Sequence, residues 1–241
     1  MRTLQNKRWM IKCSTILKHC RAYLISLPLM PSSVRIKLTQ VADINLGFSN
    51  KVNPFEWFNW SVFDLVFDLG NASGLHIADI LSISEQMNIC IYDNSEAIQS
   101  SKIFWRNENA NSIKNNAITF RVSFEEGEIL SSLPTASSHE NLYCFVNVFS
   151  ELNDSDCLSI LKNAKQAIGL FTATLAIIDF IRSESIINPH EAIKDKQLLL
   201  DKDTKQRTLT QWKTLVNKSD FTLSEVVELR SSNKVLVLKL I

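Results

Sequence analysis

The first feature of this chain that could do chemistry is an apolar segment that stops in a turn of small residues. Residues 66–74 read Val-Phe-Asp-Leu-Gly-Asn-Ala-Ser-Gly, and residues 75–81 continue with helix-like apolar spacing. In an α/β protein, a strand, tight turn and helix in this order point backbone N–H groups and a helix N-terminus at the polar groups of a ligand. Asp68, near the end of the strand, would orient that ligand. The segment therefore predicts a nucleotide-binding turn.

A second acid stands at the end of the next predicted strand. Residues 88–93 read Asn-Ile-Cys-Ile-Tyr-Asp, and a polar helical stretch begins at Ser95. An acid in this place is where a Rossmann-like sheet binds the two hydroxyl groups of a ribose. Asp93 is therefore the predicted ribose ligand.

Strands and helices alternate along the rest of the chain and would position these residues. The pattern predicts an α/β protein with a Rossmann-like, seven-stranded, mostly parallel sheet and a C-terminal antiparallel hairpin, preceded by a short helical arm. This order of elements resembles that of the class I methyltransferase fold. Nucleotide dehydrogenases usually lack that hairpin. The expected strands beyond residue 93 cover residues 118–122, 142–146, 172–180, 221–229 and 234–240, and the expected later helices begin at Asp154 and near Leu209.

The N-terminal part of the chain has a different composition from the rest. Residues 1–42 hold eight Lys and Arg and no acid, and apolar residues recur at three- and four-residue steps over residues 8–27. This spacing predicts a basic amphipathic helix. The helix could pack on the main domain or on a second subunit, target an organelle, or lie on a membrane surface. We therefore divide the chain into an arm over 1–52 and an α/β domain over 53–241.

An aromatic-rich segment begins the α/β domain. Residues 54–63 read Pro-Phe-Glu-Trp-Phe-Asn-Trp-Ser-Val-Phe. Such a segment can fill the core beside a sheet or form one wall of a pocket for a flat, apolar substrate.

Composition excludes several classes of function. Beyond residue 42 the chain has 18 basic and 25 acidic residues, which argues against nucleic acid as a partner. No apolar run reaches the roughly 20 residues of a membrane span, and the run over 170–181 is interrupted by Asp179. The cysteines form neither a CxxC pair nor a cluster with His, so we expect no disulfide framework, no metal site and a cytoplasmic location. They are Cys13, Cys20, Cys90, Cys144 and Cys157.

The order of these motifs over about residues 35–241 resembles the S-adenosylmethionine-dependent O-methyltransferases of small-molecule biosynthesis, especially those of fungal polyketide pathways. In that family an aromatic-Asp-Trp segment precedes a Val-Val-Asp-Val-Gly-Gly-Gly-x-Gly turn, and here Phe-Asn-Trp at 58–60 precedes the turn at 66–74. Three later segments also match. Residues 149–154 (Phe-Ser-Glu-Leu-Asn-Asp) correspond to Leu-His-Asp-Trp-x-Asp, residues 160–163 to Ile-Leu-x-Asn, and residues 206–212 to Glu-Arg-Thr-x-x-x-Trp.

The resemblance implies S-adenosylmethionine or S-adenosylhomocysteine as the cofactor. Its ligands would be Asp93 for the ribose and Ser123 or Phe124 on the adenine side, where the family has an acid and where Glu125 and Glu126 lie a small shift away. In the turn, Ala72 replaces the middle glycine and Asn71 stands beside it, so the backbone would approach the cofactor less closely. The implied ligands in the turn are Asp68, Gly70, Ala72 and Gly74.

The positions that correspond to the family's catalytic residues have changed. The general-base His is Ser150, the late Glu that positions that His is Gln206, and the basic residue at the end of the fourth strand is Val146. Methylation of a phenol needs a proton acceptor whose pKa lies near the working pH, and Ser150 cannot serve alone. Glu151 is a possible replacement base, although an acid in a helix-entry turn can also be a capping residue.

One further histidine lies close to the cofactor turn. His76, in the helix after the turn, fits a packed or surface position better than a catalytic one.

The chain also differs from the family ahead of the catalytic domain. The family normally carries roughly a hundred residues of helical, winged-helix-like dimerisation domain there, and this chain carries only the basic arm, as if truncated. Dimerisation would then use swapped N-terminal helices, in a homodimer or with another methyltransferase-like subunit.

Three hypotheses follow for a small-molecule binding protein of this kind. The chain could be a repurposed enzyme that catalyses a cyclisation or rearrangement without methyl transfer, or an inactive subunit that pairs with an active methyltransferase through its arm. The alternative is an active O- or N-methyltransferase of an aromatic or polyketide-like molecule. Its acceptor would need no His base, because it is an amine, a thiol or an already acidic hydroxyl group.

Overall fold

The computed structural model describes residues 55–71, 76–111, 118, 120–184, 206–229 and 233–241. The predicted arm over 1–52 lies outside these ranges. So do two predicted cofactor ligands, Ala72 and Gly74, whereas Asn71 and His76 on either side of this gap are described.

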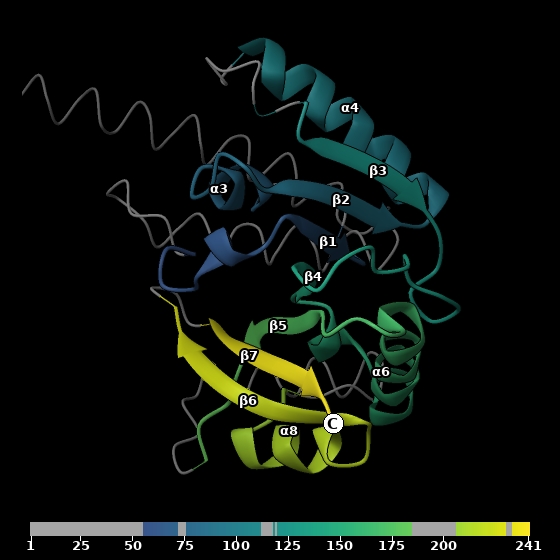
Figure 1. Ribbon diagram of the computed structural model, residues 1–241, viewed down its shortest axis with the longest axis vertical. Coiled ribbons are helices and arrows are strands. Elements are labelled where there is room, and N and C mark those ends of the chain that lie inside the picture. The colour runs from purple at the N-terminus through teal and green to yellow at the C-terminus, as the bar shows by residue number, and fades with distance from the viewer. Residues whose placement is uncertain (1–54, 72–75, 112–117, 119, 185–205, 230–232) are drawn as a thin grey trace, which may run out of the picture. The chain divides into compact units, whose positions relative to one another are not determined.

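A single seven-stranded sheet organises the described residues (Figure 1). Its strand order is β3-β2-β1-β4-β5-β7-β6. Neighbouring strands pair in parallel except β7, which is antiparallel to both β5 and β6. This arrangement confirms the predicted fold class. The strands are β1 (Leu65–Leu69), β2 (Asn88–Asp93), β3 (Val122–Glu126), β4 (Asn141–Val146), β5 (Thr174–Phe180), β6 (Phe221–Glu228) and β7 (Asn233–Leu240).

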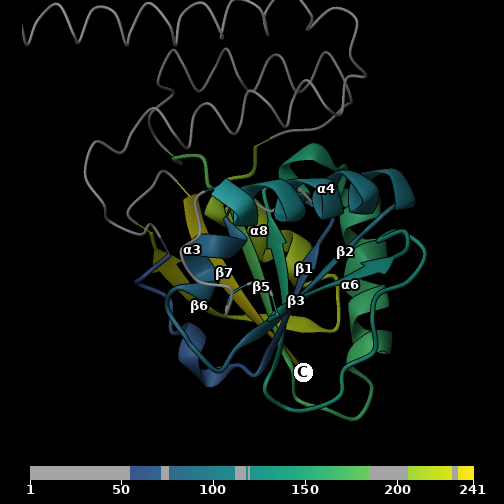
Figure 2. The ribbon, with the colours of Figure 1, turned by 90° about the horizontal axis from the view of Figure 1, so that it is seen from above.

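Helices cover both faces of the sheet, as Figures 1 and 2 show together. Side chains of α6 and α8 join one buried hydrophobic cluster, and those of α3 and α4 join a second cluster. The central strands are buried on both faces and are therefore almost continuously apolar. The helices are α3 (Ile77–Leu81), α4 (Ser95–Asn111), α6 (Asp154–Ile168) and α8 (Leu209–Val216), with 3-10 turns η2 (Trp60–Val62) and η3 (Phe149–Glu151).

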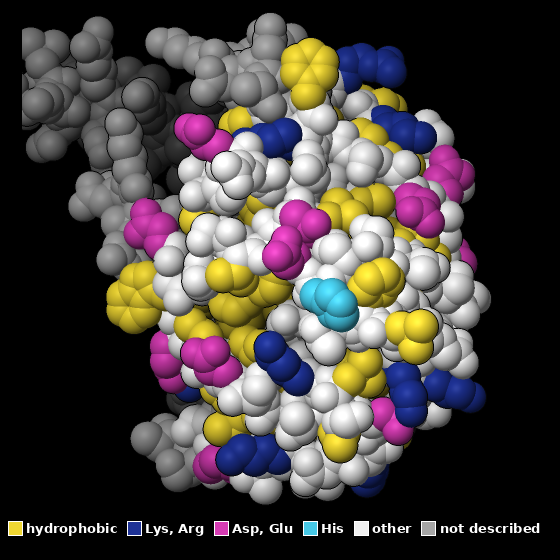
Figure 3. Space-filling view, in the orientation of Figure 1, with side chains coloured by type: hydrophobic (Ala, Val, Ile, Leu, Met, Phe, Trp, Pro, Cys, Tyr) yellow, Lys and Arg dark blue, Asp and Glu magenta, His cyan; other side chains and the backbone are white. Residues whose placement is uncertain are grey.

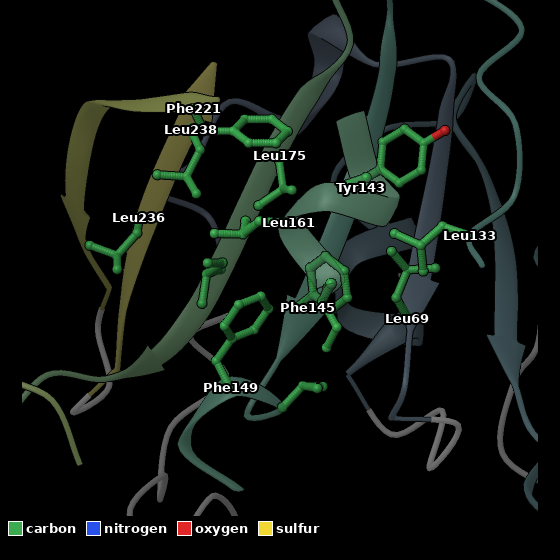
Figure 4. Close-up of a cluster of buried hydrophobic side chains, with 14 of the residues drawn as sticks. Leu69, Leu133, Tyr143, Phe145, Phe149, Leu161, Leu175, Phe221, Leu236 and Leu238 are labelled. Atoms are coloured by element: carbon green, nitrogen blue, oxygen red, sulfur yellow. The ribbon is translucent and has the colours of Figure 1, made fainter. Parts of the chain in front are cut away.

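Alternation along β4 shows how the sheet separates the two clusters. Tyr143 and Phe145 belong to the cluster beside α6, drawn in Figure 4, whereas Leu142, Cys144 and Val146 belong to the cluster beside α3. Successive side chains of a strand point to opposite faces of the sheet. The same rule therefore decides on which face each polar residue at a strand end lies.

Local signals explain where the helices begin and end. The Asn153 side chain accepts a hydrogen bond from the Asp156 N–H at the start of α6, and Gly169 ends that helix with φ of 60°. At α8, Thr208 and Gln211 form a capping box. The predicted helices at Asp154 and Leu209 are thus confirmed.

The third strand lies four residues later than predicted. The sequence pattern placed it at 118–122, whereas β3 runs from Val122 to Glu126 and Ile118 is helical. β3 is an edge strand whose residues are exposed or only partly buried, so it lacks the apolar run that marks the central strands. The correction moves Ser123 and Phe124 from the end of a strand into its middle.

The aromatic segment packs mainly in the core. Phe55, Phe58, Trp60 and Phe63 are buried in the cluster beside α3, while Trp57 is 56% exposed. Among the described residues, no helix is long and apolar enough to cross a membrane. On the face drawn in Figure 3, acidic and basic side chains are interspersed, and the described residues there form no large patch of one sign.

Candidate cofactor and acceptor site

The carboxyl ends of the parallel strands bring the predicted site residues to one edge of the sheet. Asp68 is the penultimate residue of β1, Asp93 is the last residue of β2, and Asp179 is the penultimate residue of β5. Alternation along each strand places Asp68 and Asp93 on the face beside α3, and Asp179 on the face beside α6. The edge therefore has two acidic parts, one on each face.

Gly70 begins the turn after β1 in a conformation that favours glycine. Its φ is +71°, and a Cβ at this position would lie 2.9 Å from the Ile129 Cδ1 atom. Its N–H donates to the Tyr92 carbonyl at 3.0 Å, which continues the pairing of β1 with β2 beyond Leu69. The Asn71 amide donates to the Val146 carbonyl at 2.9 Å. The start of the turn is thereby tied to the ends of β2 and β4.

Asp68 forms a buried pair with the first histidine after the turn. The Asp68 Oδ1 and His76 Nε2 atoms are 2.9 Å apart, and their side chains are 3% and 8% exposed. The other carboxylate oxygen, Oδ2, is buried and has no hydrogen-bond partner among the described residues. His76 is thus a packed residue, but one whose partner is a predicted cofactor ligand. The sequence pattern did not predict this contact.

Asp93 is buried at the carboxyl end of β2. Its Oδ1 atom accepts hydrogen bonds from the Asn94 backbone N–H at 2.8 Å and from the Asn94 amide at 3.2 Å. The position and burial of this carboxylate fit a ribose ligand.

The structure does not bring Ser123 and Phe124 to the same edge. They pair with Cys90 and Ile91 inside the sheet, whereas Glu126 pairs with Asp93. The Ser123 hydroxyl donates to the Ile89 carbonyl at 3.3 Å, and Phe124 packs on the cluster beside α3. The acid nearest to Asp93 at the end of β3 is therefore Glu126.

A third buried carboxylate, Asp179, lies on the face beside α6, and in the sequence it is visible only as a break in an apolar run. Its Oδ2 atom accepts from the Ser150 backbone N–H at 2.9 Å, and its Oδ1 atom accepts from the Phe180 backbone N–H at 2.8 Å. Burial raises the pKa of Asp179 to about 6, although these N–H groups, the Ser150 side chain and the Arg207 charge each lower it. A buried carboxylate thus lies directly against Ser150.

Of the other two predicted catalytic residues, Glu151 is adjacent to Ser150 in the chain and Gln206 lies in a later segment. Glu151 follows Ser150 in η3 and is partly buried. Gln206 is 3% exposed and directly precedes Arg207, whose backbone carbonyl accepts from the Arg182 N–H at 3.1 Å just beyond β5.

Arg207 holds the segment that follows β4. Its guanidinium donates to the Phe149 carbonyl at 2.9 Å, to the Leu152 carbonyl at 2.8 Å and to the Asp154 carboxylate at 2.7 Å. It also lies 5.3 Å from the centre of the Trp212 ring. One buried cation thereby fixes η3, the start of α6 and α8 relative to each other.

The described residues contain no group of three or more His, Cys, Asp and Glu that could hold a metal ion. The described cysteines, Cys90, Cys144 and Cys157, are buried free thiols, and burial raises the pKa of Cys157 to about 12. They are therefore poor nucleophiles at neutral pH.

Solved structures define the class of the fold, which is the α/β methyltransferase fold. TnmH aligns over 95% of this chain and 68% of its own, with a TM-score of 0.72 and 18% identity. NcsB1 from neocarzinostatin biosynthesis, in complex with S-adenosylmethionine and 2-hydroxy-5-methyl naphthoic acid, aligns over 87% of this chain and 57% of its own, with a TM-score of 0.69 and 14% identity.

More particularly, the chain belongs to the O-methyltransferase family, because the model of the O-methyltransferase domain matches residues 48–222. O-methyltransferase 7 of Dictyostelium discoideum is 26% identical over 70% of this chain and 44% of its own length. The (RS)-norcoclaurine 6-O-methyltransferase of Thalictrum flavum is 23% identical over 67% of this chain and 42% of its own length. The chain thus spans less than half the length of these relatives.

Proposed function

We propose that this chain is a methyltransferase that uses S-adenosylmethionine and acts on a small molecule with an acidic hydroxyl, amine or thiol group. The observation that carries the proposal is the row of buried carboxylates Asp68, Asp93 and Asp179 along one edge of the sheet. Relatives that methylate small natural products favour this alternative over a non-methylating cyclisation enzyme and over an inactive partner subunit.

The residues on the face beside α3 suit the cofactor. Gly70 gives the turn after β1 its positive φ, and Asp68 retains a buried oxygen that can still accept a hydrogen bond. Asp93 would bind the ribose, and the turn through Ala72 and Gly74 would bind the rest. When bound, S-adenosylmethionine supplies an electrophilic methyl group on a positively charged sulfur.

The residues on the face beside α6 suit the acceptor. A hydroxyl, amine or thiol that gains a methyl group must lose a proton, and Asp179 is the proposed proton acceptor. Its pKa of about 6 leaves it mostly ionised at neutral pH yet close enough to accept a proton. Ser150 holds this carboxylate through its backbone N–H. Glu151 is the second candidate base, and Gln206 would orient the acceptor.

A calorimetric titration with S-adenosylhomocysteine tests the cofactor half of the proposal. We expect saturable binding to one site per chain, weakened at least tenfold by Asp93→Ala because a ribose ligand is lost. The matched control is Asp220→Ala, which removes an exposed acid paired with Lys165. No binding heat with the unmodified chain, or equal losses in the two variants, would contradict the assignment.

A transfer assay tests the reaction itself. The chain is incubated with S-adenosylmethionine carrying a labelled methyl group and with separate sets of phenols, carboxylic acids, amines and thiols. We expect label to enter at least one set. If the chain binds S-adenosylhomocysteine but labels none of these compounds, the result would favour a non-methylating cyclisation enzyme or an inactive partner subunit.

A further inference from the structure

We propose that His76 is a positioning residue for the cofactor, because it holds the Asp68 carboxylate in the orientation that leaves Oδ2 available to a hydrogen-bond donor of the cofactor. This inference rests on the proposed function. The motif of the cofactor turn, residues 66–74, does not include His76. The proposed role therefore rests on the contacts of His76 in this structure.

His76 and Asp68 form a buried hydrogen bond with a defined direction. A carboxylate oxygen only accepts hydrogen bonds, so the His76 Nε2–H donates to Asp68 Oδ1 across 2.9 Å. Both side chains are at least nine-tenths buried. Burial of a carboxylate without a partner is costly, and the imidazole N–H offsets part of that cost. Asp68 therefore has a fixed orientation as well as a fixed backbone.

His76 is itself held from two sides. Its backbone carbonyl accepts from the Ile80 N–H at 3.1 Å, which anchors it to α3. Its ring lies 6.2 Å from the centre of the buried Phe55 ring. Asp79, one turn along α3, has its pKa raised by burial and lowered by the His76 charge, so it is a second acid within electrostatic reach. The imidazole therefore keeps its direction towards β1.

The second oxygen of Asp68 is what points to a ligand. Oδ2 is buried without a hydrogen-bond partner among the described residues, whereas buried acceptors in folded proteins are nearly always satisfied. Two residues further along, Gly70 begins the turn after β1 with φ of +71°. A cofactor N–H or O–H at this turn would complete the bonding of the carboxylate.

A double-mutant cycle on S-adenosylhomocysteine binding tests the inference. We expect His76→Ala to weaken binding about tenfold to a hundredfold, the range for a hydrogen bond to a charged group. In an Asp68→Asn background the same substitution should change binding less than about twofold, because the carboxylate through which it acts is gone. Equal losses in the two backgrounds would overturn the inference.

Rescue by a conservative variant separates positioning from packing. The His76→Gln side chain carries an amide N–H near the former Nε2 position, so we expect its affinity to return to within about threefold of the unmodified chain. His139→Ala is the matched control, because it removes a histidine that contacts the Thr172 hydroxyl at 2.9 Å on an exposed loop. Binding to His76→Gln as weak as to His76→Ala would count against positioning.

The two proposals fail in different ways. If the unmodified chain does not bind S-adenosylhomocysteine, the proposed function fails and this inference fails with it. If the unmodified chain binds and the cycle is additive, only the role of His76 is lost. Urea unfolding without ligand is measured for each variant. If His76→Ala does not fold, the double-mutant cycle is measured with His76→Gln and His76→Asn in place of His76→Ala, each with Asp68 and with Asp68→Asn.

Discussion

The carboxylate of Asp179 is the central residue of the proposed acceptor site. Burial disfavours the ionised form of Asp179 and raises its pKa, and hydrogen bonds from backbone N–H groups of η3 and β5 offset only part of this effect. Sequence inspection could see an acid inside an apolar run. It could not see the contact with Ser150, because the two residues meet only when β4 and β5 pair.

This burial predicts a pH-dependent stability. The pKa of Asp179 rises from 3.8 to about 6 on folding, so between these values the folded chain binds more protons than the unfolded chain. Stability contributed by this group is therefore present below about pH 4 and is lost as the pH rises through 6, by roughly 3 kcal/mol in all. Relative to the unmodified chain, Asp179→Asn should gain that amount between pH 4 and 7 in urea unfolding. A difference that does not change with pH would contradict the shift.

The same group predicts the pH profile of the reaction. If ionised Asp179 accepts the proton, kcat/KM should rise about tenfold per pH unit below 6 and level off above it. Asp179→Asn should lower kcat by about a hundredfold or more, whereas the matched change Glu151→Gln should lower it by less than about threefold. The opposite ranking would make Glu151 the base.

At the scale of elements, the segment over 206–212 connects several elements of the fold through Arg207. The resemblance to the family's Arg-Thr-x-x-x-Trp pattern identified the segment without explaining it. In the structure, Arg207 joins η3, α6 and α8 through two carbonyls, a carboxylate and the Trp212 ring. The two carbonyls and the carboxylate lie more than 50 residues before Arg207 in the chain, so spacing alone could not predict these contacts.

The buried position of Arg207 predicts a large cost of removal. Arg207→Met should lower the free energy of unfolding by about 3–5 kcal/mol, because the Phe149 and Leu152 carbonyls each lose a hydrogen bond from a charged donor. Asp154→Asn should cost less than about 1 kcal/mol, because the Asp154 side chain is 49% exposed. Urea unfolding of the two variants checks the contrast, and similar costs would show that the carboxylate and not the carbonyls matters.

Edge strands are harder to predict from the sequence pattern than central strands. The central strands were predicted well because burial on both faces makes them continuously apolar. β3 has only one neighbour and carries Ser123, Glu125 and Glu126, so its place depends on pairing with β2. The displaced strand in turn displaced two predicted cofactor ligands.

At the scale of the whole molecule, the order of elements was the most reliable signal. Five strands alternating with helices and then a hairpin predicted the sheet that the structure has. The shared edge of Asp68 and Asp93 also followed from that order, because acids at the carboxyl ends of parallel strands lie at the same edge of a sheet. The His76 contact did not follow, because no regular spacing pairs an acid in a strand with a residue eight positions later.

Assembly is a prediction that the sequence of the arm makes for the whole molecule. The apolar positions over 8–27 include Leu17 and Leu24, and we expect them to join two copies of the chain. Light scattering after size exclusion should then give twice the 27.4 kDa chain mass. Leu17→Asp with Leu24→Asp should halve it, whereas Lys18→Asp should not. A single-chain mass for the unmodified protein, without a co-purifying subunit, would count against a partner role for the arm.

The position of β7 has a consequence for how the sheet is assembled in time. β6 precedes β7 along the chain, yet β7 lies between β5 and β6. β6 therefore has no place in the sheet until β7 has paired with β5. Until that moment β5 is an open edge with six buried residues in its final state, which makes it a ready template for pairing with another chain. A slow last pairing step would lengthen the period in which the folding chain is prone to aggregate.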